Sequence, residues 1–189
     1  NCEFHDLLSN GQPSGTVSSQ GLGRTSPEYI INEKETNHLS EFWSNFLNLK
    51  PKKSLNVALN RFKFSYQRLL PEDRLIDLVI ALESLFLTGI KDELGYRLAL
   101  RGAFFIEEEI EKRRKMFDFL RDVYELRGAV VHGKELTNKD LKPFGGLPQN
   151  FHTMLEDTEE IVRKALRKFM FSGKSHDELL KDVDKQILS

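Results

Sequence analysis

The chain has 189 residues, of which 39% are hydrophobic and 30% are charged. A chain of this length is expected to form a single domain whose core is stable without cross-links. Its formal net charge is -1 at pH 7. This value argues against a protein that coats nucleic acid along its whole surface, because such domains are usually strongly basic.

The sequence also bears on compartment, membrane and cofactors. The single cysteine, Cys2, excludes an intramolecular disulfide and fits a reducing compartment, so we expect a cytoplasmic protein. No apolar run is long enough to cross a bilayer, and the first residues lack the pattern of a secretory signal, so we expect no membrane contact. The scattered histidines lack the spacing of a zinc site. We therefore expect no metal and no other cofactor.

Two parts are predicted. Residues 1–35 are expected to be a flexible N-terminal segment or linker, because residues 9–25 are rich in Gly, Ser and Gln and show no helical period. The chain also lacks an initiator Met, so we expect an upstream domain in a longer chain. Residues 36–189 carry apolar side chains at helical spacing and predict an all-α domain.

Within this domain, the first helix is predicted from Thr36 to about Lys50, with Trp43 as an expected core anchor. The second is predicted to begin at Ser54 and to keep its apolar face inward as far as Leu69. All charges of this second segment are basic, which predicts either a phosphate-attracting face or an ordinary solvated one.

The third helix is expected to open at Pro71, because a proline followed by two acidic residues is typical of a first helical turn. Glu83 lies in one of its apolar rows, and a carboxylate there needs a basic partner or must stay neutral. Arg97, Arg101 and Arg127 are the candidate partners. A structural ion pair that fixes an arginine is favoured over a catalytic role for Glu83.

A fourth helix is predicted over residues 93–105, and a long central helix follows it and ends at Gly133, a residue type that often terminates helices. Residues 133–149 contain Gly and Pro and predict a long irregular segment, a candidate lid over a site. Two further helices are expected, one after residue 150 and a short one after a cap at Ser175.

The central helix is the most informative element, because Arg127 falls within its apolar surface and arginine is rarely buried without a partner. His132 is expected near the helix end. Residues five apart on a regular α-helix point about 140° away from each other. The two side chains can therefore converge only if the helix loosens, for which Gly128 and Gly133 are suitable residues.

The segment YELRGAVVHG, with four residues between Arg127 and His132, resembles the R-x4-6-H signature of the HEPN superfamily. Upstream, RLIDLVIALESLFL (residues 74–87) and YRLALRGAFF (residues 96–105) resemble the Apea-like HEPN branch in order and spacing. The resemblance covers roughly residues 36–170. It implies a HEPN-like helical bundle that forms a homodimer and acts as a metal-independent ribonuclease, with Arg and His of both copies lining a shared cleft.

The residue chemistry agrees with this expectation. Cleavage of RNA by attack of the 2′-OH needs a proton acceptor and a proton donor, and imidazole can serve as either near neutral pH. A guanidinium offers a rigid fork to phosphate oxygens. We therefore expect Arg127 and His132 to be catalytic. Further candidates are the supporting residues Glu83, Tyr124 and Lys134 and the RNA-binding residues Arg101 and Arg121.

Two departures from the family pattern stand beside the resemblance. Gly128 follows the arginine where HEPN nucleases often have a polar residue, and Lys134 stands where some toxin members have a tyrosine. The first hypothesis is thus a dimeric ribonuclease, an effector of a defence system or a toxin. The alternative is a non-catalytic helical module for dimerisation or RNA binding, in which His132 caps its helix and Arg127 pairs with Glu83.

Overall fold

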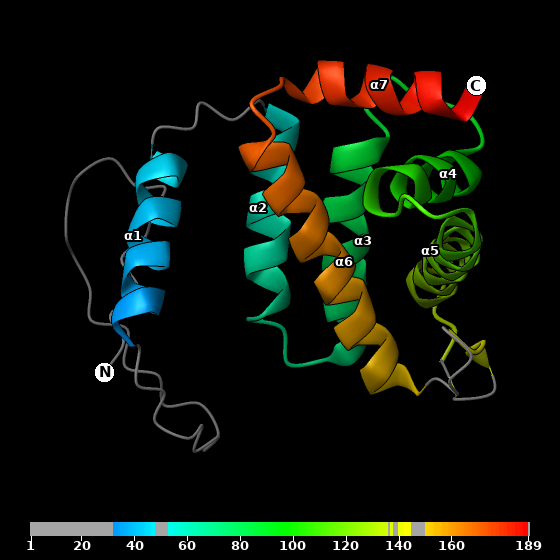
Figure 1. Ribbon diagram of the computed structural model, residues 1–189. Helices are drawn as coiled ribbons and strands as arrows, with labels where there is room; N and C mark the ends of the chain where they lie inside the picture. Colours follow the sequence, from blue (N-terminus) through cyan, green and yellow to red (C-terminus); the bar gives the residue numbers. More distant parts are fainter. Residues whose placement is uncertain (1–31, 48–52, 136, 138–139, 145–149, 189) are drawn as a thin grey trace. The chain divides into compact units, whose positions relative to one another are not determined.

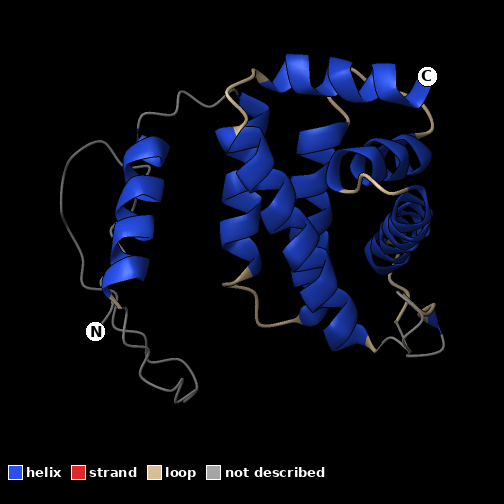
Figure 2. Ribbon diagram, in the orientation of Figure 1, coloured by secondary structure: helices blue, strands red, loops and turns tan. Residues whose placement is uncertain are grey.

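The computed structural model describes residues 32–47, 53–135, 137, 140–144 and 150–188. These residues form seven α-helices and no strand (Figure 2), which confirms the expected all-α class. The predicted flexible segment lies almost wholly outside the described residues. The helices are α1 (Glu33–Leu47), α2 (Lys53–Ser65), α3 (Pro71–Phe86), α4 (Leu94–Ile106), α5 (Ile110–Val131), α6 (Phe151–Phe171) and α7 (His176–Leu188).

The chain divides into two compact units, Asn1–Ser40 and Glu41–Ser189, and the division falls inside α1. In the larger unit, α3 is the central helix and packs against α2, α4, α5 and α6 (Figure 1). Its core side chains are fully buried, and each contributes roughly 1.5–3 kcal/mol through removal of apolar surface from water. These side chains are Leu75, Leu78, Val79, Leu82, Leu85 and Phe86.

Three aromatic rings join α3, α4 and α6. Phe86 meets Phe105 edge-on at 5.5 Å between ring centroids, and Phe169 stacks on Phe105 at 4.4 Å. Nearby, α5 comes close to α4 because Gly102 has no side chain. A Cβ at Gly102 would lie 2.6 Å from Leu120 Cδ1. The position of α5, which carries Arg127, is thus set by close packing on α4.

Buried carboxylates bind most of the arginines near α2. Asp77, whose side chain is 2% exposed, accepts hydrogen bonds from Arg61 at 2.9 Å and from Arg68 at 2.6 Å. On α6, Glu159 accepts from the hydroxyl of Tyr66 at 2.5 Å and pairs with Arg74 and Arg163. Arg61 and Arg68 belong to the segment for which the sequence predicts a phosphate-attracting or solvated basic face. In the structure both are bound to Asp77.

Helix boundaries were predicted best where a local signal is strong. Pro71 is at the start of α3, and Ser175 accepts a hydrogen bond from the Glu178 N–H at 3.3 Å, as expected for a cap. The predicted extent of α2 to Leu69 was wrong, because this helix ends at Ser65 and Leu69 is 88% exposed. Trp43 is 40% exposed, so it is not the buried anchor that the sequence suggested.

Candidate functional site

The C-terminal end of α5 is a regular, well-capped helix end. Gly133 has a φ of +81°, and its N–H donates to the Val130 carbonyl at 2.9 Å. The Lys134 N–H donates to the Ala129 carbonyl at 2.9 Å, which completes a Schellman motif. The helix does not loosen at Gly128, as convergence of Arg127 and His132 would require, and α5 stays helical through Val131. The prediction that Gly133 ends the helix is confirmed.

This regularity separates Arg127 from His132. Both lie at the end of α5, yet side chains five residues apart on such a helix point about 140° away from each other. His132 is exposed at the C-cap position, where its backbone N–H donates to the Gly128 carbonyl at 3.1 Å, and its side chain makes no hydrogen bond or ion pair with the part of the chain that the structure describes. The route to convergence within one chain, a loosened helix end, is therefore absent.

Arg127 meets Glu83 of α3. Its Nη2 lies 3.6 Å from Glu83 Oε2, and the two side chains are 26% and 22% exposed. The predicted structural ion pair is confirmed, and its partner is Arg127 rather than Arg97 or Arg101. The Nε atom of Arg127 is buried and has no hydrogen-bond partner among the described residues. This guanidinium therefore keeps unused hydrogen-bonding capacity.

Burial sets the electrostatics around this pair. Burial raises the pKa of Glu83 above its usual value, and the Arg127 charge only partly opposes the shift. Burial likewise raises the pKa of Tyr124, helped by the negative charge of Glu83. Tyr124 thus remains a neutral hydroxyl at physiological pH. Glu83, Tyr124 and Arg127 form one electrostatically coupled group on the surface between α3 and α5.

Tyr124 also belongs to a partly exposed apolar face. A Cβ at Gly95 would lie 2.7 Å from Tyr124 Cδ1, so the start of α4 rests directly on this ring. The adjacent Tyr96 packs edge-on against Phe117 with 5.5 Å between ring centroids. Tyr96 and Val131 are each about half exposed. Phe117, Tyr124 and Val131 recur every seven residues, and with Tyr96 they form what we call the α4–α5 apolar face.

Lys134 and the segment after it fold onto themselves. Lys134 Nζ lies 2.5 Å from Asp140 Oδ1, and Asp140 also accepts hydrogen bonds from the N–H and the hydroxyl of Thr137 at 2.9 Å. The Lys134 bond and the Thr137 bonds lower the pKa of Asp140 to about 2. The structure thus places Lys134 in an ion pair of its own segment, and no described contact joins it to Arg127.

Of the expected lid, residues 133–149, the structure describes residues 133–135, 137 and 140–144. Phe144 packs on Phe119 of α5 with 4.1 Å between ring centroids, and Lys142 pairs with Asp122 at 2.5 Å. Residues 122 and 124 point about 160° apart on a regular helix, so these contacts lie on a different side of α5 from Tyr124. The contacts of residues 140–144 with α5 are made to Asp122 and Phe119 and not to Arg127. Residues 145–149 lie outside the described residues.

The two arginines predicted to bind RNA differ in their surroundings. Arg101 is 9% exposed, and its guanidinium donates to both carboxylate oxygens of Asp184 on α7 and to the Phe86 carbonyl. It joins three elements, and the prediction that it contacts RNA is not supported by this buried position. Arg121 is exposed, lies 3.4 Å from Glu125, and keeps its guanidinium above the Phe117 ring. It borders the α4–α5 apolar face.

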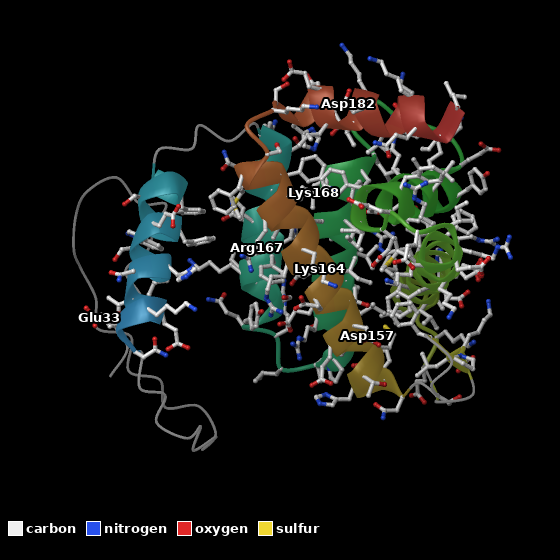
Figure 3. The ribbon with its side chains drawn as sticks, in the orientation of Figure 1. Glu33, Asp157, Lys164, Arg167, Lys168 and Asp182 are labelled. Carbon is white, nitrogen blue, oxygen red and sulfur yellow. The ribbon has the colours of Figure 1, made fainter. Side chains whose placement is uncertain are left out.

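The sequence interpretation missed exposed cations on α6. Lys164 and Arg167 are exposed on this helix (Figure 3), while Lys168 donates to the Phe105 carbonyl at 2.7 Å. The basic residues on the side opposite the apolar stripe of α6 were the available signal. Among the described residues, no cluster of His, Cys, Asp and Glu could hold a metal ion, and no described helix is long and apolar enough to cross a membrane.

Comparison with known proteins identifies no relative: no family model matches the chain, and no curated protein or solved structure matches it significantly.

Proposed function

We propose that this protein is a metal-independent endoribonuclease of the HEPN type, active as a homodimer and serving as a cytoplasmic defence or toxin effector. One observation carries the proposal. The end of α5 presents a guanidinium with unused donors and an exposed imidazole, but a regular helix directs them about 140° apart. One chain thus holds both groups but does not aim them at one phosphate, whereas a second copy related by a two-fold axis supplies the missing group.

In this reaction His132 of one copy removes the proton of a ribose 2′-OH. The 2′-oxygen attacks the adjacent phosphorus, and the bond from phosphorus to the 5′-oxygen breaks. His132 of the other copy protonates the departing 5′-oxygen, which leaves a 2′,3′-cyclic phosphate and a 5′-hydroxyl. Arg127 binds the phosphate oxygens as negative charge develops on them. No metal is needed, because two imidazoles and a guanidinium supply all proton transfers and the charge stabilisation.

The α4–α5 apolar face is the surface that we assign to the second copy. Three of its four residues lie on α5, the helix of Arg127, and it leaves Tyr96 of α4 and Val131 of α5 about half exposed. Burying such a surface is favourable by about 25 cal/mol per Å² of apolar area. The charges at its margin have both signs, since Arg121 and Glu125 are neighbours there, so a two-fold axis can place opposite charges together.

The test is cleavage of single-stranded RNA in excess EDTA by the whole chain, compared with Arg127→Ala and His132→Ala. Both variants are expected to lose activity by 10²-fold or more. Arg167→Ala is the matched control, because it removes an exposed arginine on α6 (Figure 3) and should leave cleavage unchanged. Equal cleavage by all four proteins rules out the site. A strictly monomeric mass in solution during cleavage contradicts the shared arrangement.

A second candidate function is favoured by the contacts of Arg127 itself. Arg127 pairs with Glu83 within its own chain and His132 occupies the helix C-cap, and each of these contacts needs no catalytic role for the residue. This arrangement suits a non-catalytic module that dimerises or binds RNA within a larger protein. The same assay separates the two functions, since a module binds or pairs without EDTA-resistant cleavage.

A further inference from the structure

The Arg127–Glu83 pair differs in geometry from the part-buried pair of Arg101 with Asp184. Arg101 is held by Asp184 through two hydrogen bonds of 2.8 and 2.7 Å. Arg127 and Glu83, although each is about three-quarters buried, approach only to 3.6 Å. Charge-assisted hydrogen bonds between nitrogen and oxygen are usually about 2.7–2.9 Å long. Glu83 therefore neutralises Arg127 at a distance without occupying its hydrogen-bonding fork.

We propose that Glu83 is an internal stand-in for phosphate, a positioning residue that holds Arg127 in the free protein and competes with the RNA backbone for it. The inference rests on the proposed function, because it concerns the anion that Arg127 binds there. It adds that RNA affinity at this site is limited by a carboxylate of the protein. A phosphate diester presents two oxygens to the guanidinium, whereas Glu83 makes no hydrogen bond with it.

The surroundings of Glu83 fit this role. The residue interrupts an apolar row of α3. The raised pKa of its carboxyl group indicates that burial destabilises the ionised form more than the charge of Arg127 stabilises it. Tyr124 lies next to the pair and adds no positive charge. A carboxylate held so weakly can give up its arginine to a better anion. By contrast, Asp184 uses both oxygens to hold Arg101.

The direction in which RNA affinity changes when the charge of Glu83 is removed shows whether Glu83 competes with phosphate or only orients Arg127. If Glu83 competes with phosphate, removal of its charge tightens RNA binding. If Glu83 only orients Arg127, the same change loosens the arginine and weakens binding. Glu83→Gln keeps the size of the side chain. Glu83→Leu is a second variant that suits the apolar row of α3. It allows the same affinity measurement if Glu83→Gln folds poorly.

The probe is a fluorescein-labelled 2′-O-methyl oligonucleotide of uridines, which keeps the phosphate backbone but has no 2′-OH to attack. Binding is followed by fluorescence anisotropy with the whole chain. Asp182→Asn is the matched control, because it removes one negative charge on α7, where Asp182 pairs with Lys174 (Figure 3). Both charge changes raise the net charge by one, so general electrostatic attraction is cancelled in the comparison.

Glu83→Gln and Glu83→Leu are expected to bind at least about 3-fold more tightly than Asp182→Asn, and the gain should vanish when Arg127→Ala is added. Equal or weaker binding overturns the inference, as does a gain that persists without Arg127, and so does the absence of binding in every variant. The cleavage assay tests the proposed ribonuclease function independently of this competition. A gain in affinity without any cleavage refutes the ribonuclease and keeps the competition, whereas cleavage that depends on Arg127 with unchanged affinity does the reverse.

Discussion

Arg101 of α4 and Asp184 of α7 form two parallel hydrogen bonds, of 2.8 and 2.7 Å, across 83 residues of sequence. The Phe86 carbonyl accepts a third bond from the same guanidinium at 2.7 Å. One arginine thus connects the end of α3, the middle of α4 and the last helix of the bundle. Its nearly complete burial distinguishes it from the exposed arginines that could reach a ligand.

We predict that Asp184→Ala lowers the free energy of unfolding by about 1–3 kcal/mol, because it leaves the charge of Arg101 buried without its partner. The estimate lies below that for a fully buried pair, because Asp184 is 43% exposed. Urea denaturation followed by circular dichroism measures the change. Arg97→Ala is the control on the same helix, since its pair with Glu93 is exposed and 3.7 Å long, and it should change stability by less than about 0.5 kcal/mol.

Substitution by alanine of the two glycines near the end of α5 should change the stability of the protein in opposite directions. Gly133 has a φ of +81°, so Gly133→Ala is expected to destabilise the protein by about 1 kcal/mol through backbone strain, although the added methyl group meets no neighbour. Gly128 is helical and has open space around it, so Gly128→Ala should stabilise by about 0.5–1 kcal/mol. Thermal melting of both variants checks this. A stabilising Gly133→Ala contradicts the helix end described here.

A pH dependence follows from the raised pKa of Glu83. The folded state binds the Glu83 proton more readily than the unfolded state does, because burial raises the pKa above the reference value of 4.5. The stability contributed by protonated Glu83 is therefore complete below about pH 4.5 and is lost as the pH rises through the folded-state pKa. Glu83→Gln should gain stability relative to the wild type as the pH rises from about 4 to 7. A difference that is constant with pH shows that the pair with Arg127 cancels the effect of burial, and a difference that shrinks shows that the pair outweighs it.

The pKa of Asp140 is shifted in the opposite direction, so its effect changes with pH in the opposite sense. Its pKa falls from 3.8 to about 2 because Lys134 and Thr137 bind its ionised form. The contribution of Asp140 is therefore complete above about pH 4 and is lost as the pH falls through 2. The partners of this carboxylate, Lys134 and Thr137, lie within six residues of it in the same segment, so the effect is expected in local order rather than in global stability. Hydrogen exchange at the Thr137 amide, corrected for its intrinsic pH dependence, should speed up in Asp140→Asn above pH 4, and unchanged exchange would refute the contact.

Local signals in the sequence determined the class of the fold and several helix ends. Pro71 starts α3, Gly133 ends α5 and Ser175 caps α7, because each residue acts on the backbone within one turn of itself. The apolar periodicity determined which faces of α3 and α6 are buried. It did not determine the end of α2, where Leu69 continues the helical spacing but lies exposed in the turn before Pro71.

Only the tertiary structure decided which partners the charged residues have. Glu83 could have met any of three arginines, and the packing of α3 on α5 selected Arg127. Arg101 instead pairs with Asp184, a residue that no local sequence pattern connects with it. Whether Arg127 and His132 converge also depended on the last turn of α5, which is regular in the structure and directs the two side chains apart. Ion pairs between distant segments depend on how the helices pack against one another, and that packing follows from the whole core rather than from the sequence near each charge.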